Sequence, residues 1–132
     1  IYNYFVKIDH ALAMDNLKKA EKIISSLDGY PELKYMAFSQ LAHAYLHMGE
    51  KSLTEFYVSK SEEVEKENPK LNYDAHLLPY IKTRNFMASG DYQKAIEVVN
   101  GVIEKIKHQP IDYYNGNVYV MKASIQNSLG EF

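Results

Sequence analysis

The sequence predicts an all-α protein, a solenoid of antiparallel helical hairpins with about seven helices. Apolar residues recur at helical spacing along nearly all of the 132 residues, and no stretch alternates every two residues as a strand would. Glycines at positions 49, 90 and 130 each follow an apolar helical stretch and precede an acidic residue. A recurrence of this size is typical of stacked hairpins, because a single hairpin cannot bury its apolar face without a neighbour.

The N-terminal half is expected to consist of helices joined by short turns. An apolar stripe ends at Asp28 and Gly29, and Pro31 suits the first turn of a new helix that runs to Gly49. Another helix follows from about Ser52, and its charged far end, residues 61–67, is interpreted as a solvated face. The apolar stripes are Leu17, Ala20, Ile23, Ile24 and Leu27, then Phe38, Leu41, Ala42 and Tyr45, then Leu53, Phe56, Tyr57 and Val64.

The C-terminal half begins after a loop at residues 68–72, with a helix expected over about 73–89. Pro79 either bends that helix or follows its start near Leu78, so we expect irregular backbone over residues 75–79. Asp91 suits the N-cap of the next helix, which ends before Pro110. Its apolar stripe is Ala95, Val99, Val102 and Ile106. A last helix is expected over about 112–129.

These segments are expected to form a single domain, with hairpins at about 1–29, 31–68 and 73–108 and half a hairpin at 112–132. Because nothing follows the last helix to pair with it, we expect the chain to be a fragment of a longer protein. We also expect the apolar face of that helix to lie exposed or to be covered by a second copy of the chain. That face carries Val118, Met121, Ile125 and Leu129.

The pairing of helices resembles the tetratricopeptide repeat family. Residues in the order of the family's motif are Phe86, Gly90, Tyr92, Ala95 and Pro110 in one repeat, and Phe38, Leu41, Ala42, Tyr45, Gly49 and Pro69 in the repeat before it. The first repeat has Asp15 in the place of the turn glycine, followed by Leu17 and Ala20, and the last offers Tyr119, Ala123 and Gly130. The resemblance implies a right-handed superhelix that serves as a scaffold for proteins or peptides.

Two features depart from the family pattern. The steps from Gly49 to Gly90 and from Gly90 to Gly130 are 41 and 40 residues, against about 34 in the family. Such long repeats are similar to those of bacterial regulators, in which the superhelix senses a ligand and controls an attached DNA-binding domain. In addition, Lys82 with Thr83, and Lys122 with Ala123, stand where the family usually has leucine and a small residue.

The resemblance also implies a binding site, because in the family the first helix of each hairpin lines a concave groove. Spacings of three and four residues put the corresponding side chains on one face of each helix. The groove residues expected in this chain are Tyr2, Phe5, Asp9, Ser39, His43, His47, Tyr80, Arg84, Asn117, Ser124 and Asn127. Arg84, the only arginine, either binds an anionic group of a peptide or pairs with an acidic residue of the next helix.

Composition excludes several classes of partner. The formal net charge is −2 and Arg84 is the only arginine among 15 basic residues, so direct binding of nucleic acid is not expected. No apolar run reaches the length of a membrane span. The chain has no cysteine, which rules out disulfides and thiolate metal sites. The compartment stays open on this evidence, with a cytoplasmic location favoured over a periplasmic one.

Catalysis is not expected. His43 and His47 have the spacing of zinc ligands on a helix, but no glutamate lies between them and no third ligand can be named. Asp9 and His10 are neighbours that point to different faces of a helix. The sequence contains neither a phosphate-binding glycine loop nor a nucleophile elbow. We therefore expect neither a metal nor another cofactor.

Three functions are considered. The leading one is a non-catalytic scaffold that binds a protein or peptide in a concave groove. The alternative is the ligand-sensing or dimerisation region of a larger bacterial transcriptional regulator, and a helix-turn-helix elsewhere in the full-length sequence would favour it. Part of an enzyme is the most distant alternative, and metal bound at His43 and His47 would favour it.

Overall fold

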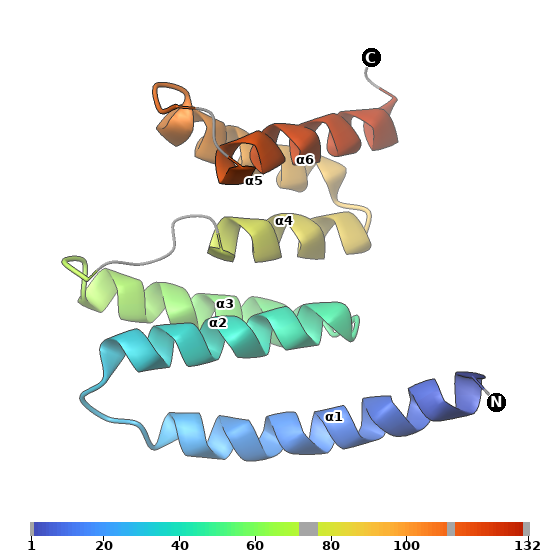
Figure 1. Cartoon of the computed structure of the whole chain (residues 1–132), viewed down its shortest axis with the longest axis vertical. Helices are drawn as coiled ribbons and strands as arrows, with labels where there is room; N and C mark the ends of the chain where they lie inside the picture. The colour runs from blue at the N-terminus through green and yellow to red at the C-terminus, as the bar shows by residue number, and fades with distance from the viewer. Residues whose placement is uncertain (1, 72–76, 111–112, 131–132) are drawn as a thin grey trace. The chain divides into compact units, whose positions relative to one another are not determined.

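The computed structural model describes the backbone of residues 2–71, 77–110 and 113–130, and the side chains of residues 10–71, 77–110 and 115–130. These residues form six α-helices and no strand (Figure 1). The helices are α1 (Tyr2–Ser25), α2 (Pro31–His47), α3 (Lys51–Glu67), α4 (Leu77–Ala88), α5 (Tyr92–Ile106) and α6 (Tyr113–Leu129). The all-α prediction is confirmed, and none of these helices is both long and apolar enough to span a membrane.

The chain divides into two compact units, residues 1–73 and 74–132, each of which is described by itself. In the first unit α2 packs along α3, and α1 contacts α2. In the second unit α5 packs against both α4 and α6. Each unit therefore contains one hairpin of the predicted kind together with one further helix, and a superhelical arrangement of the whole chain stays a prediction.

The predicted count of seven helices is wrong, because the first 25 residues do not form a hairpin. They contain one continuous helix of 24 residues, α1. Asp15, which was expected in a turn, lies inside α1 and pairs with Lys19 one turn later, with 3.1 Å between the carboxylate and the ammonium. Residues 2–25 include neither glycine nor proline, so nothing in this stretch interrupts the helix.

The two remaining hairpins use the same turn, which confirms the repeated glycine signal. Gly49 and Gly90 follow α2 and α4 with φ angles of 75° and 79°, the left-handed conformation in which glycine has no steric penalty. The next amide then reaches back to the end of the helix. Glu50 donates to the Tyr45 carbonyl at 3.0 Å, and Asp91 donates to the Phe86 carbonyl at 2.8 Å. Asp91 occupies the predicted N-cap, although its side chain makes no capping hydrogen bond.

The packing between the helices of each hairpin also repeats after 41 residues. Three small or β-branched positions are buried in both hairpins, and the pairs are Ala42 and Thr83, Thr54 and Ala95, and Val58 and Val99. Thr83, which departs from the small residue usual in the family, donates its hydroxyl to the Pro79 carbonyl at 2.7 Å. The Thr83 hydroxyl therefore has its hydrogen-bond partner within α4. It can be buried at the close contact between α4 and α5 without leaving an unsatisfied polar group.

Pro79 is the third residue of α4 as the structure describes it. Proline is tolerated in the first turn of a helix, because amides there have no partner within the helix. Where the helix begins also depends on residues 72–76, which lie outside the described residues, so both alternatives for its start stay predictions. The irregular backbone expected just before it falls partly on residues 75 and 76, which lie outside the described residues.

The apolar face of α6 lies inside the second unit, so the expectation that it is exposed is wrong. Val118 and Ile125 are buried together with Ala95, Val99 and Ile106 of α5, and Met121 and Leu129 pack against this cluster. The face of α6 that was expected to lack a partner helix instead packs against α5. Among the described side chains of α6, the large apolar residues that are exposed are Tyr119 and Val120. Self-association through Val118, Met121, Ile125 and Leu129 thus loses its structural basis.

Candidate functional site

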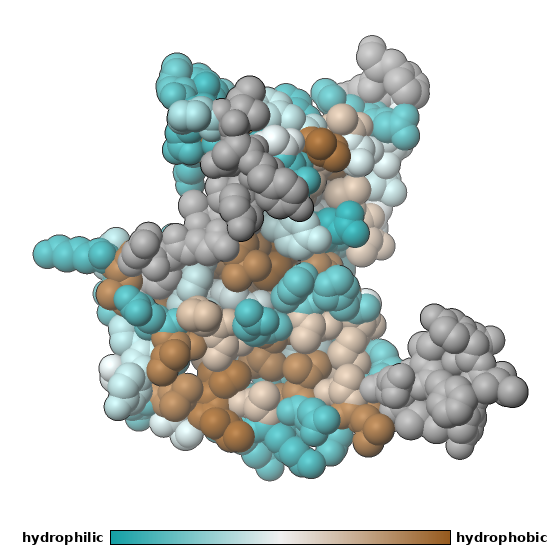
Figure 2. Space-filling view, viewed as in Figure 1, coloured by the Kyte–Doolittle hydropathy of each residue, from teal (hydrophilic) through white to brown (hydrophobic). Residues whose placement is uncertain are grey.

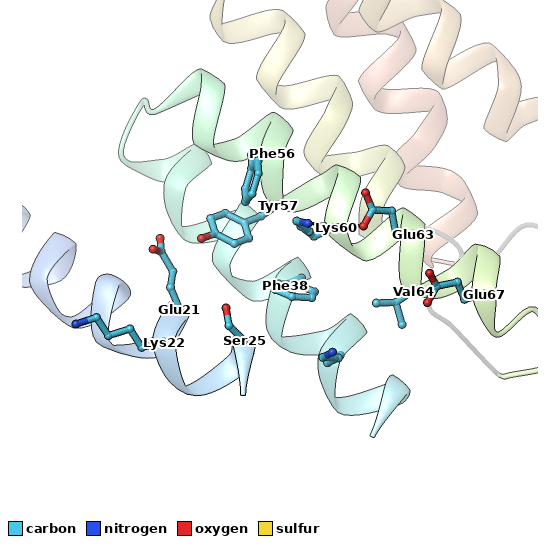
Figure 3. Close-up of a pocket in the computed structure, with 11 residues that line it drawn as sticks. Glu21, Lys22, Ser25, Phe38, Phe56, Tyr57, Lys60, Glu63, Val64 and Glu67 are labelled. Carbon is cyan, nitrogen blue, oxygen red and sulfur yellow. Dashed lines mark ion pairs between the residues drawn. The ribbon is translucent and has the colours of Figure 1, made fainter. Parts of the chain in front are cut away.

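An open cleft of about 850 Å³ lies on the first unit, lined by residues of α1, α2 and α3 (Figure 3). It is formed where the end of α1 approaches the hairpin of α2 and α3. Aromatic side chains and charged side chains of both signs line it. The lining residues are Glu21, Lys22, Ser25, Lys34, Phe38, Phe56, Tyr57, Lys60, Glu63, Val64 and Glu67.

Stacked aromatic rings form one wall of the cleft. The Tyr57 ring stacks on Phe38, with 6.0 Å between the ring centroids, and on Tyr45, with 5.7 Å. Phe56 meets Tyr57 edge to face at 5.0 Å. Tyr57 and Phe38 are buried, whereas the Phe56 side chain is half exposed, at 51%. The wall is therefore fixed by its packing, and Phe56 is the ring that a bound molecule can reach most easily.

Glu21 joins α1 to this wall. The Tyr45 hydroxyl donates to the Glu21 carboxylate, and the Tyr57 hydroxyl also hydrogen-bonds to Glu21. Figure 3 shows the Glu21 and Tyr57 side chains directed toward each other across the cleft. Burial, and then the hydrogen bond to Glu21, raise the pKa of Tyr57 to about 12 and raise the pKa of Tyr45 as well. Both phenols consequently stay protonated as donors over the whole physiological range.

Charges of opposite sign are paired around the rim. The Lys60 ammonium lies 3.8 Å from the Glu63 carboxylate and 5.3 Å from the centroid of the Phe56 ring. The Lys34 ammonium lies 3.7 Å from Asp28. Exposed ion pairs of this kind contribute little to stability. Their charged groups can therefore pair with a bound molecule instead, with little loss of stability. The cleft thus combines an apolar wall with donors and acceptors at its edge.

Ser39, a predicted groove residue, is buried between α2 and α3. Its hydroxyl donates to the Tyr35 carbonyl at 2.7 Å and lies 3.0 Å from the Ser61 hydroxyl. Ser61 also contacts the Tyr35 carbonyl, at 3.3 Å. The small polar pair lets the two helices approach closely, and Ser39 therefore serves their packing rather than an open surface.

His43 and His47 lie one turn apart on α2, with 3.0 Å between their Nε2 atoms. His47 is exposed and His43 is half-buried. Burial, and then the neighbouring His47, lower the pKa of His43. Neither imidazole lines the cleft. Among the described residues no group of three or more histidine, cysteine or acidic side chains is arranged to hold a metal ion.

The other predicted groove residues belong to α1 or to the second unit. The side chains of Tyr2, Phe5 and Asp9 lie outside the described residues. Tyr80 and Arg84 of α4 are exposed, Tyr80 at 37%. Asn117, Ser124 and Asn127 of α6 are exposed as well. Each unit is described by itself, so a groove that spans both units stays a prediction.

None of the cleft residues was among the predicted site residues. The sequence does carry a signal for part of the set, since Phe56, Lys60, Glu63 and Glu67 follow one another at spacings of four, three and four on α3. Residues 61–67 were interpreted as a solvated face, and their charged side chains are indeed exposed. The approach of α1 turns part of that face into one side of a cleft.

Figure 2 shows apolar side chains gathered on one face of the first unit. Exposed apolar residues of α1 and α2 include Ile23, Leu33 and Met36. Single exposed apolar residues are common on proteins, but a gathering of them marks a surface suited to contact with another molecule. The first unit therefore offers both a cleft and exposed apolar surface.

Comparison of the chain with protein-family models, with curated proteins and with solved structures found no match.

Proposed function

We propose that this chain is a non-catalytic helical-repeat module that binds a protein or peptide, and that the cleft of the first unit holds a segment of that partner. The cleft is the observation that carries the proposal. Its volume of about 850 Å³ is of the size that accommodates several side chains, and it is open to solvent rather than enclosed. The repeated hairpin turns at Gly49 and Gly90 support the helical-repeat part of the proposal.

The lining of the cleft suits a segment that carries both apolar and charged side chains. Phe38, Phe56 and Tyr57 provide ring surface for an apolar side chain. Lys60 and Glu63 lie beside those rings and can pair with charges of either sign on the segment. Buried aromatic contacts surrounded by a polar rim are the usual composition of a protein-binding surface.

Selection from a random-peptide library displayed on phage tests this function, with the purified chain as target. We expect enrichment of peptides that combine aromatic or aliphatic residues with charged residues. A synthetic copy of an enriched peptide should bind the chain in fluorescence anisotropy. Phe56→Ala should weaken that binding by about tenfold or more, because the exposed ring contributes to the interface but little to the core.

Tyr119→Ala is the matched control, since it removes an exposed aromatic ring from α6 in the second unit. It should leave peptide affinity unchanged. A folded chain that enriches no peptide, or enriched peptides that bind Phe56→Ala as tightly as the parent chain, would contradict the proposed function.

A further inference from the structure

The two imidazoles on α2 form an arrangement that the cleft does not use. His43 and His47 are separated by one helical turn, and their Nε2 atoms converge to 3.0 Å. Their ring centroids are 4.5 Å apart, and the ring planes are tilted by 55°. The two rings therefore lie close together, and each brings a nitrogen that can bind a metal ion to within 3.0 Å of the other.

The distances between the two rings fit a shared ligand position. With about 1.1 Å from Nε2 to the ring centre, a head-on hydrogen bond of this length would separate the centroids by about 5.2 Å. Two imidazoles bound to one ion at about 2.0–2.1 Å would place them about 4.6 Å apart. The observed 4.5 Å agrees with the second arrangement, and a bent hydrogen bond between the two rings has the same separation.

We infer that His43 and His47 form a bidentate chelate for a divalent transition-metal ion of the Cu²⁺ or Ni²⁺ class. Nitrogens 3.0 Å apart and about 2.05 Å from an ion subtend an angle of about 90° at that ion. This angle matches adjacent positions of a square-planar or octahedral ion, whereas tetrahedral Zn²⁺ requires a wider one. Cu²⁺ also has the highest affinity for nitrogen ligands among the divalent first-row metals.

The inferred chelate consists of these two imidazoles, and water can occupy the positions that they leave open. Among the described residues no third histidine, cysteine or carboxylate completes the set. Two imidazoles by themselves do not make a closed zinc site, which has four protein ligands. The inferred chelate is instead an exchangeable site on the surface of α2, formed without any change in the helix. On binding, the proton shared between the two Nε2 atoms is lost from that position, and each ring keeps a proton on Nδ1.

Calorimetric titration of CuCl₂ into the purified chain, prepared without a histidine tag, tests the inference. We expect one ion per chain, and electron paramagnetic resonance of the Cu²⁺ complex should show coupling to two imidazole nitrogens. His47→Gln should weaken Cu²⁺ binding by about tenfold or more, because a single imidazole loses the chelate. His47 is exposed, so this variant should keep the helical circular dichroism of the parent chain.

His108→Ala is the matched control, because it removes an exposed histidine outside α2. It should leave the affinity for Cu²⁺ unchanged. The double variant His43→Ala/His47→Ala should lose the site altogether. Cu²⁺ binding that persists in the double variant, that falls equally in His108→Ala, or that shows a single coordinated nitrogen would overturn the chelate. The peptide-binding proposal is unaffected by any of these outcomes, since neither histidine lines the cleft.

Discussion

At the scale of single residues, two glycines of this chain are expected to affect stability in opposite directions, because their backbone conformations differ. Gly90 has a φ angle of 79°, which an alanine adopts only with strain, whereas Gly101 lies in the interior of α5. An added Cβ meets no other atom within 4 Å at either position. The difference between the two sites is therefore one of backbone conformation and not of space.

Gly90→Ala should lower the free energy of unfolding by about 1 kcal/mol, and Gly101→Ala should raise it by about 0.5–1 kcal/mol. The first substitution puts a side chain into a left-handed turn, and the second removes the entropic cost of a glycine within a helix. Denaturation by urea, followed by circular dichroism, measures both changes. Equal effects of the same sign would show that the turn geometry at Gly90 does not control the stability of the hairpin.

At the scale of secondary-structure elements, the packing of α6 decides how its apolar residues behave. Ile125 is fully buried against α5, at 0% exposure. Ile125→Ala should therefore lower the free energy of unfolding by about 2–5 kcal/mol, the usual cost of an unfilled cavity. If this face instead joined two copies of the chain, the substitution would shift sedimentation from dimer toward monomer. Val120→Ala, at an exposed position of the same helix, is the control and should have little effect on stability.

The elements differ in how far the sequence could predict them. The turns after α2 and α4 were predictable because a glycine with positive φ is a local requirement that leaves a signal in the sequence. The continuity of α1 was missed because the repeat pattern suggested a turn at Asp15, although no helix-breaking residue occurs there. Local chemistry proved more informative than the extrapolated repeat.

The cleft could not be predicted from the sequence, since it arises from contacts between separate helices. Phe38 and Tyr57 have the spacing of ordinary core residues on α2 and α3, and Glu21 has that of a surface residue on α1. The burial of Ile24 and the interactions of Tyr45 and Tyr57 with Glu21 bring the end of α1 beside the hairpin. A carboxylate that anchors one helix to the tyrosines of two others carries no distinctive pattern within any one of them.

At the scale of the whole molecule, stability is distributed over two units that each have their own core. In the first unit the buried residues are mainly Leu41, Ala42, Tyr45, Tyr57 and Val58, and in the second they are mainly Ala95, Val99, Ile106, Val118 and Ile125. Tyrosines thus belong to the core of the first unit, and the core cluster of the second unit is made of aliphatic residues. Alkaline pH is accordingly expected to ionise buried tyrosines of the first unit, whereas the aliphatic core cluster of the second unit has no group to ionise.

The chain should lose stability as the pH rises from about 10 to 12. In the unfolded chain tyrosine ionises near pH 10, whereas Tyr57 keeps its proton in the folded chain up to about pH 12. The raised pKa of Tyr57 therefore contributes stability that is fully present below about pH 10 and is lost as the pH rises through the folded value. Tyr45, whose pKa is also raised, contributes in the same direction.

The midpoint of urea denaturation should fall steeply across this window. In the double variant Tyr45→Phe/Tyr57→Phe the midpoint should start lower, because two hydrogen bonds to Glu21 are lost, and should then depend much less on pH. Tyr119→Phe, at an exposed position, should follow the parent chain. A double variant with the same alkaline slope as the parent would show that Glu21 and the two tyrosines do not hold α1 to the hairpin.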